Sequence, residues 1–168
     1  AVLGMFSAEA TYAQSAASLL TRLNAGLFRR AIEARFLTSF YGILASDGTF
    51  TYSNAGHNAP MLVSTSGDVR RLDTGGLVLG LFEHAAFEEE TLTLHKGDFI
   101  IIFSDGVTEA LDMEGTEFTD ERLLASIEAH RQDPPEALLD GLLADVRGFC
   151  GEATANDDVT IVVVRYDG

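Results

Sequence analysis

The sequence predicts an α+β fold, a layered sandwich in which helices flank antiparallel strands. Three observations predict it: an apolar helical stripe near the start, a middle region of short strands joined by glycine-containing turns, and two further helices before a last strand. Strands that are linked by hairpins pair antiparallel. Helices that are grouped before and after the strands suit a layered α+β arrangement.

Length and composition indicate one cytoplasmic domain. The chain has 168 residues, enough to bury a sizeable core, so we expect residues 1–168 to form a single domain. No apolar run reaches the ~18 residues of a transmembrane helix, and the first residues lack a signal-peptide pattern. The single Cys150 cannot form an intrachain disulfide, which fits a reducing cytoplasm.

The net charge argues against one class of partner. The chain has 11 Lys and Arg against 26 Asp and Glu, a formal charge of −15. Nucleic-acid binding needs basic patches that contact phosphates, so we expect no nucleic-acid partner, and we expect no membrane contact from this segment. A solvated acidic surface accounts for most of the acids, while a minority can converge on bound cations.

The first predicted element is a helix that ends near residue 30. Its leucines recur at helical spacing and predict a buried face, at positions Leu19, Leu20, Leu23 and Leu27. Three arginines follow, Arg29, Arg30 and Arg35. They either interact with the C-terminal dipole of the helix or form a docking patch for an acidic or phosphorylated partner. The helical pattern is present from Ala1 onward with no N-cap residue before it. We therefore expect this sequence to be part of a longer protein.

The middle of the chain predicts strands in hairpins. Two pairs of strands flank turn signals, one pair at 36–45 and 50–54 and the other at 61–64 and 69–72. The glycines between residues 75 and 80 are interpreted as turn residues, and residues 87–94 as a half-exposed strand. The apolar run Phe99 to Phe103 has no polar break, which is typical of a strand buried on both faces.

Two helices and a strand complete the prediction. The first helix has Thr119 as N-cap and Asp120 and Glu121 in its first turn. The second begins at Pro134-Pro135, and Gly148 and Gly151 are expected to help end it. The last strand is predicted over residues 158–166.

Two carboxylate clusters lie where buried strands begin or end. Asp105 and Glu109 follow the apolar run, and Asp157 and Asp158 precede the last strand. Hard divalent cations prefer oxygen ligands, and Mg²⁺ and Mn²⁺ sites often use few carboxylates plus waters. Two such clusters on adjacent strands could hold one or two metals. The alternative is structural: Asp105 caps the turn or helix that follows it, and Asp157 and Asp158 form a turn.

Other chemistries find no support in the sequence. The four histidines lack zinc-site spacing. There is no Gly-x-Ser-x-Gly nucleophile motif, and the glycines at 75–80 do not spell a Walker A loop, which requires Gly-Lys-Ser/Thr.

Several motifs together resemble one family. Residues 103–109 (FSDGVTE) and 156–160 (NDDVT) resemble the metal-binding signatures of the PPM (type 2C) metal-dependent protein phosphatases, and most closely their SpoIIE-like bacterial branch. Residues 54–60 (NAGHNAP) look like that branch's Ala-Gly-His motif, and residues 75–80 and 96–98 also fit it in order and spacing. The resemblance covers essentially the whole chain.

The resemblance implies a fold and an activity. The family's fold is an α/β/β/α sandwich of two antiparallel sheets flanked by helices. Its members hydrolyse phosphoserine or phosphothreonine on proteins with two Mn²⁺ or Mg²⁺ ions, which activate a water that attacks phosphorus directly. The bacterial relatives act on small STAS-domain anti-sigma-factor antagonists, and sensory or receiver domains usually precede them.

The resemblance also implies site residues. Asp105 and Asp157 match metal-ligand aspartates, and Glu109 stands where some relatives hold an additional, weaker metal. Asp158 matches a residue that supports the ligands rather than binding the metal itself. Gly56 and His57 either contact the substrate or shape the end of the sheet.

One departure from the family pattern matters. The family's N-terminal strands carry an Asp-Gly or Asp-x-x-Gly-His-Gly element whose aspartate bridges both metals, and no such element precedes Ala1. We therefore expect an N-terminally incomplete domain, whose exposed core would favour a homodimer or strand exchange. The competing hypothesis is a non-catalytic binding module with a phosphatase fold.

Overall fold

The computed structural model describes residues 15–29, 36–153 and 157–168. The chain divides into two units, one made of residues 1–59, 72–96 and 168, the other of residues 60–71 and 97–167. Each unit contains one sheet and its own helices. The part of the first helical pattern before residue 15, and Arg30 and Arg35, lie outside the described residues.

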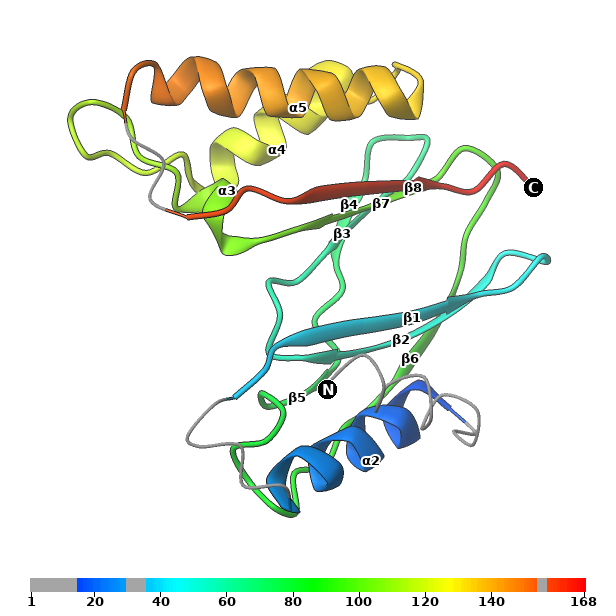
Figure 1. Cartoon of the computed structure of the whole chain (residues 1–168). Coiled ribbons are helices and arrows are strands. Elements are labelled where there is room, and N and C mark those ends of the chain that lie inside the picture. Colours follow the sequence, from blue (N-terminus) through cyan, green and yellow to red (C-terminus); the bar gives the residue numbers. More distant parts are fainter. Residues whose placement is uncertain (1–14, 30–35, 154–156) are drawn as a thin grey trace. The chain divides into compact units, whose positions relative to one another are not determined.

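Among the described residues, the first unit is a four-stranded sheet with helix α2 packed on it (Figure 1). Its elements are α2 (Ala16–Arg29), β1 (Ser39–Leu44), β2 (Thr49–Ala55), β5 (Gly75–Gly76) and β6 (Glu90–Thr93). Strand β2 is central, because it pairs antiparallel with β1 and β6 and parallel with β5. The predicted leucine stripe is buried: Leu19, Leu20 and Leu23 of α2 pack with Ala55, Leu79 and Phe87.

The first predicted hairpin is confirmed, whereas the glycine-rich connection is more ordered than we expected. The Thr49 N–H donates to the Asp47 carboxylate at 2.9 Å, and Gly48 takes a positive φ of 85° between β1 and β2. Gly75 and Gly76, interpreted as turn residues, instead form β5 beside the end of β2. A Cβ at Gly75 would lie 1.8 Å from the Asn54 carbonyl oxygen, so only glycine lets the two backbones approach this closely.

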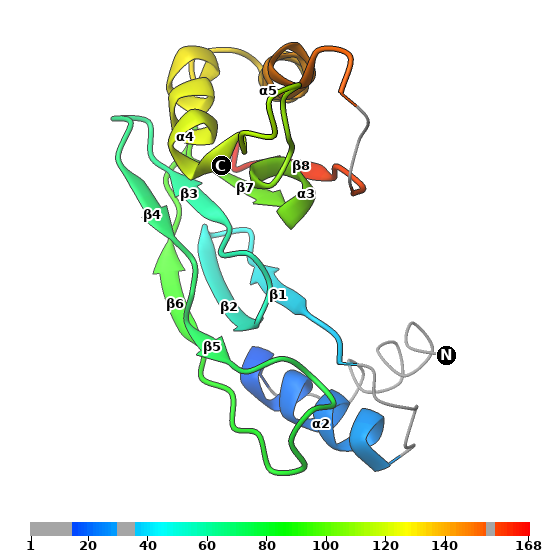
Figure 2. The same ribbon diagram turned by 90° about the vertical axis from the view of Figure 1, so that its left-hand side faces the viewer.

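The second unit is a fully antiparallel sheet with order β4-β3-β7-β8. Its strands are β3 (Met61–Val63), β4 (Val69–Arg71), β7 (Phe99–Phe103) and β8 (Ile161–Arg165), and its helices are α3 (Asp105–Thr108), α4 (Thr119–His130) and α5 (Pro135–Cys150). Strand β7 lies between β3 and β8 and is almost entirely buried, as predicted. Helices α4 and α5 lie on one face of this sheet (Figures 1 and 2).

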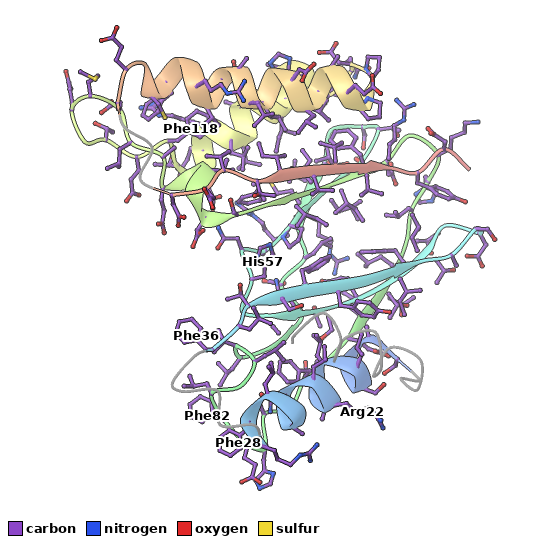
Figure 3. All side chains as sticks on the ribbon, in the orientation of Figure 1. Arg22, Phe28, Phe36, His57, Phe82 and Phe118 are labelled. Carbon is purple, nitrogen blue, oxygen red and sulfur yellow. The ribbon has the colours of Figure 1, made fainter. Side chains whose placement is uncertain are left out.

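The core of the second unit forms between that face and the helices. It combines Ile101 and Phe103 of β7 with buried residues of α4 and α5, among them Leu123, Ile127 and Leu142. Phe118 joins it from the residue before α4 (Figure 3), with its ring 5.3 Å from the ring of Phe149 and edge-on to it. Apolar burial of this kind is the main force that holds helices on a sheet.

The helix ends show two departures from the sequence prediction. Thr119 is the first residue of α4, with a φ of 67°, and the N-cap position is occupied by Phe118 without a side-chain cap. Helix α5 begins at Pro135 as predicted and ends at Cys150. Gly151 is its C-cap, and the Gly151 N–H donates to the Arg147 carbonyl at 3.0 Å. Gly148, however, lies inside α5 rather than at its end.

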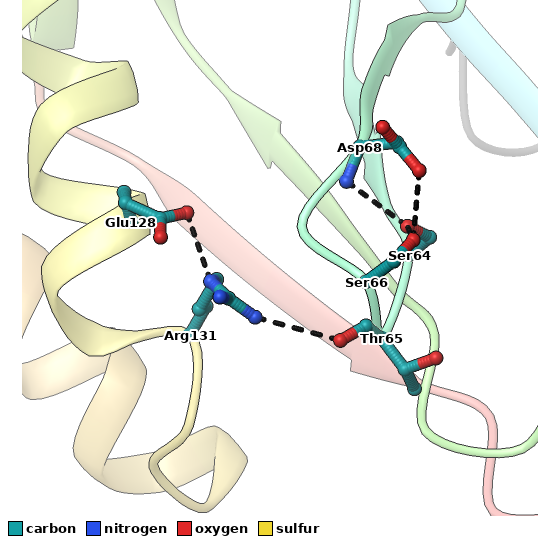
Figure 4. A network of polar contacts seen from close by, with 6 residues as sticks. All are labelled: Ser64, Thr65, Ser66, Asp68, Glu128 and Arg131. Atoms are coloured by element: carbon teal, nitrogen blue, oxygen red, sulfur yellow. Dashed lines mark hydrogen bonds and ion pairs between the residues drawn. The ribbon is translucent and has the colours of Figure 1, made fainter.

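A polar network ties the end of α4 to the turn between β3 and β4 (Figure 4). Arg131 pairs with Glu128 at 2.8 Å and donates to the Thr65 carbonyl at 3.4 Å. Inside the turn, the Ser64 hydroxyl accepts from the Asp68 N–H at 3.0 Å and Ser66 donates to the Asp68 carboxylate at 2.7 Å. These contacts fix the second predicted hairpin against the helix layer.

The predicted fold class is confirmed: the protein is an α+β protein with two mainly antiparallel sheets and helices packed on them. Across residues 15–29, 36–153 and 157–168, no helix combines the length and the apolar character that a membrane crossing requires.

Candidate metal centre

Asp105 stands at the point where the buried strand β7 turns into the short helix α3. Ser104 takes the N-cap position with extended backbone, so Asp105 is the first residue of the helix rather than its cap. The Asp105 side chain is exposed, and its Oδ1 accepts the Gly106 N–H at 3.0 Å. This bond orients one carboxylate oxygen toward the backbone.

Glu109 follows α3 directly and occupies its C-cap position. Its backbone N–H donates to the Asp105 carbonyl at 2.9 Å, which places it one turn of chain after Asp105. Its side chain is exposed. Glu109 therefore lies one helical turn after Asp105, at the other end of α3.

The second carboxylate cluster lies beside the first, at the entry to β8. Strand β8 pairs antiparallel with β7, and Ile161, its first residue, is opposite Phe103, the last residue of β7. Asp157 and Asp158 come just before β8 and are exposed. Asp157 repeats the arrangement of Asp105, because its Oδ1 accepts the N–H of the next residue at 2.7 Å. Antiparallel pairing thus brings the two segments to the same end of one sheet.

Ser104 joins the two segments by hydrogen bonds. Its hydroxyl donates to the Asp158 carbonyl at 2.9 Å and accepts the Thr160 N–H at 3.0 Å. Its backbone N–H donates to the Thr160 carbonyl, also at 3.0 Å. The chain before Asp105 is therefore held against the chain that follows Asp157.

Gly106 allows the same close approach from the other side of Asp105. A Cβ built on Gly106 would lie 2.5 Å from the Asp158 carbonyl oxygen, a distance that real Cβ atoms do not tolerate. Sequence reasoning did not single out Ser104 or Gly106. Both residues flank Asp105 within the motif at residues 103–109 on which the family resemblance rests. That position was the available sign that they matter to the site.

The remaining predicted site residues, Gly56 and His57, belong to the other unit, beyond the end of β2 (Figure 3). The buried Asn54 holds them: its Oδ1 accepts the His57 N–H at 2.8 Å, and its Nδ2 donates to the carbonyls of His57 and Leu72. Gly56 has a φ of 70°, and a Cβ there would lie 2.6 Å from the Val78 side chain. The loop is therefore built for glycine at 56 and oriented by Asn54.

The donor set suits a hard cation with few protein ligands. Carboxylate oxygens are what Mg²⁺ and Mn²⁺ prefer, and Mg²⁺ usually keeps several waters and uses one or two carboxylates. Asp105 and Asp157 supply such a pair on abutting backbone segments. In the parts of the chain that the structure describes, no group of three or more His, Cys, Asp and Glu residues could hold a metal ion. The pair thus fits the chemistry of the expected ions but falls short of a complete protein cage.

The chain is similar to a protein-family model and to curated proteins. Residues 1–167 match the family model described as stage II sporulation protein E (SpoIIE). The chain is 32% identical over 154 residues to the phosphoserine phosphatase RsbU of Bacillus subtilis, which covers 88% of this chain and 44% of RsbU. The chain spans less than half the length of this relative and of another curated relative that it matches.

Solved structures show the same fold. The SiaA-PP2C domain of Pseudomonas aeruginosa superposes with a TM-score of 0.84 at 18% identity, over 99% of this chain and 68% of that one. The PP2C phosphatase domain of SpoIIE from Bacillus subtilis, solved with a fragment of its regulatory domain, gives a TM-score of 0.79 at 20% identity, over 98% of this chain and 48% of that one. At these identities the likeness establishes the fold.

Proposed function

The chain belongs to the SpoIIE family, and from that premise we propose that it is a metal-dependent phosphoprotein phosphatase domain that hydrolyses phosphoserine or phosphothreonine. One observation supports the proposal above others: the Asp105 and Asp157 segments, 52 positions apart in the sequence, abut at one end of a sheet. The printed name of the relative RsbU, a phosphoserine phosphatase, supports the substrate class.

In this proposal Asp105 and Asp157 hold Mn²⁺ or Mg²⁺, with two ions in the complete domain. Each aspartate accepts one backbone N–H at Oδ1, and a carboxylate has further lone pairs that would bind a cation. Glu109 adds a carboxylate for a further, weaker ion, and Asp158 steadies the Asp157 loop through its backbone. Bound divalent cations supply a Lewis acid and lower the pKa of a coordinated water.

Gly56 and His57 are proposed as substrate contacts. Asn54 fixes the backbone of His57 by two hydrogen bonds, so the imidazole projects from a backbone held in one position. Phosphoryl oxygens accept hydrogen bonds from imidazole and from backbone N–H groups.

The proposed partner is a small phosphoprotein of the STAS-domain anti-sigma-factor antagonist class. We also propose an upstream sensory or receiver domain as the source of control, a homodimer as the assembly and the cytoplasm as the location. RsbU and the SpoIIE structure both extend beyond the region that this chain matches, and the SpoIIE structure includes a fragment of a regulatory domain, which supports the proposal of a further domain.

The test is phosphate release by the full-length protein with and without Mn²⁺. We expect Mn²⁺-dependent hydrolysis of a phosphoserine peptide, and we expect Asp105→Asn to reduce it by more than ~100-fold because a metal ligand loses its charge. Asp140→Asn is the matched control, since Asp140 is an exposed acid on α5. Retained turnover in Asp105→Asn would remove that residue from the site.

The absence of a three-ligand cluster among the described residues favours a second candidate, a non-catalytic module that binds phosphoproteins. The same assay separates the two. If the full-length protein binds the phosphopeptide but releases no phosphate at any Mn²⁺ concentration, the binding module is correct and the enzyme is not.

A further inference from the structure

We propose that Ser104 is the positioning residue of the metal centre and that its hydroxyl sets the separation of Asp105 and Asp157. The inference rests on the proposed function in one respect, the assignment of these two aspartates as metal ligands. It adds a residue whose role is to place those ligands and not to bind the ion or the substrate.

The Ser104 hydroxyl does not cap the helix that follows it. Serine at an N-cap usually accepts a backbone N–H from the first turn of its own helix. Ser104 occupies the N-cap position of α3, yet its side chain makes no cap bond there. The hydroxyl is instead directed across to the segment that leads into β8.

The Ser104 hydroxyl makes two hydrogen bonds, one as donor and one as acceptor. It donates to the Asp158 carbonyl at 2.9 Å and accepts the Thr160 N–H at 3.0 Å. These two groups bracket Val159, so one oxygen atom fixes both ends of a short stretch of backbone. Only a hydroxyl side chain of this length can serve as donor and acceptor in this way.

The backbone that Ser104 holds is the segment that carries Asp157. The Asp158 N–H is bonded to the Asp157 carboxylate at 2.7 Å, while its carbonyl is bonded to Ser104. On the other strand, Asp105 is the residue next to Ser104, and its own carboxylate is bonded to the Gly106 N–H at 3.0 Å. Ser104 is therefore joined to the Asp157 segment by hydrogen bonds and to Asp105 by the peptide backbone.

Two other contacts would still hold the segments together if the Ser104 hydroxyl were removed. The close approach that Gly106 allows to the Asp158 backbone and the bond from the Ser104 N–H to the Thr160 carbonyl would keep the two segments close. Ser104→Ala should therefore fold, but its Asp157 loop should sample several positions. Looser support of ligands typically weakens metal affinity by about 10- to 100-fold.

The experiment is calorimetric Mn²⁺ titration of the full-length protein, together with urea unfolding without metal. We expect Ser104→Ala to weaken Mn²⁺ binding by roughly tenfold at unchanged stoichiometry, and Ser104→Thr, which keeps the hydroxyl, to restore most of the affinity. The control is Ser126→Ala, which removes a hydroxyl bond between Ser126 of α4 and Asp145 of α5. It should lower stability and leave Mn²⁺ affinity unchanged.

The outcomes separate the two proposals. If Asp105→Asn binds Mn²⁺ as tightly as the wild type, the assigned metal site is wrong. If Asp105→Asn loses binding but Ser104→Ala binds as tightly as the wild type, the site stands and the positioning role of Ser104 is overturned. Equal weakening in Ser104→Ala and Ser126→Ala would also overturn it, because the effect would then follow general stability.

Discussion

At the scale of single residues, Asp112 organises the loop between α3 and α4. Its Oδ1 accepts the backbone N–H groups of Glu114 at 2.8 Å and Thr116 at 2.9 Å. The Thr116 N–H, followed by that of Glu114, holds the pKa of Asp112 below its usual value. Because the folded pKa is depressed, the ionised carboxylate supports the loop fully above the unfolded pKa, and the support is lost as the pH falls through the folded pKa.

We therefore expect the loop to loosen in acid before the rest of the unit does. After correction for intrinsic rates, amide hydrogen exchange at Glu114 and Thr116 should accelerate below about pH 4, the region of an unperturbed aspartate. Asp112→Asn should abolish this pH dependence. Exchange that stays constant from pH 5 to pH 3 in the wild type would contradict the role of the carboxylate.

The sequence predicts the place of some residues of the candidate site but not the role of others. Asp105 and Asp157 could be paired from the sequence because each carboxylate flanks an apolar strand. The role of Ser104 could not, because its partners lie 54 and 56 positions away and a serine before a helix indicates an N-cap. The prediction of Thr119 as an N-cap was wrong for a related reason. Its residue type is typical of a cap, whereas its backbone takes a φ of 67°.

At the scale of elements, the contact between β2 and β5 depends on the missing side chain of Gly75. The strands pair in parallel over two residues, and a Cβ at Gly75 would lie 1.8 Å from the Asn54 carbonyl oxygen. The sequence showed two adjacent glycines but not what approached them, so it predicted a turn. Strand pairing across 20 residues depends on tertiary contacts that local patterns do not contain.

We expect Gly75→Ala to destabilise the protein by more than ~2 kcal/mol, since the clash is with backbone and cannot be relieved by a rotamer change. Gly148→Ala is a control of opposite sign. Gly148 lies inside α5 with nothing within 4 Å of an added Cβ, so alanine should be neutral or stabilising by up to about 1 kcal/mol. Urea unfolding of both variants checks the pair, and equal effects would contradict the steric argument.

At the scale of the whole molecule, each unit carries its own apolar core. The sequence predicted which residues enter these cores, because the leucine stripe of α2 and the apolar run of β7 follow recognisable periods. It predicted the fold class for the same reason. It did not predict the division of the chain, in which residues 60–71 leave the first unit and join the second, because that division depends on which strands pair.

The buried position of β7 leads to a whole-molecule prediction. Ile101 is 0% exposed in the core of the second unit, whereas Val164 on the edge strand β8 is 38% exposed. Ile101→Ala should cost about 2–5 kcal/mol of unfolding free energy, and Val164→Ala about 0.5 kcal/mol. Thermal and urea unfolding would measure both, and a comparable loss in the two variants would mean that β8 is covered in solution.

The pairing of Phe103 with Ile161 encloses α3, α4 and α5 in one long loop of chain. Closing such a loop is entropically costly, whereas the helix contacts inside it are local. The strand β8 should therefore dock late during folding, after the helices have formed. Asp105 and Asp157 meet only at that step, so a divalent cation has little to bind in the unfolded chain. An ion held by both residues would leave the folding rate nearly unchanged and slow unfolding. It would therefore increase the kinetic stability of the folded protein without helping the chain to fold.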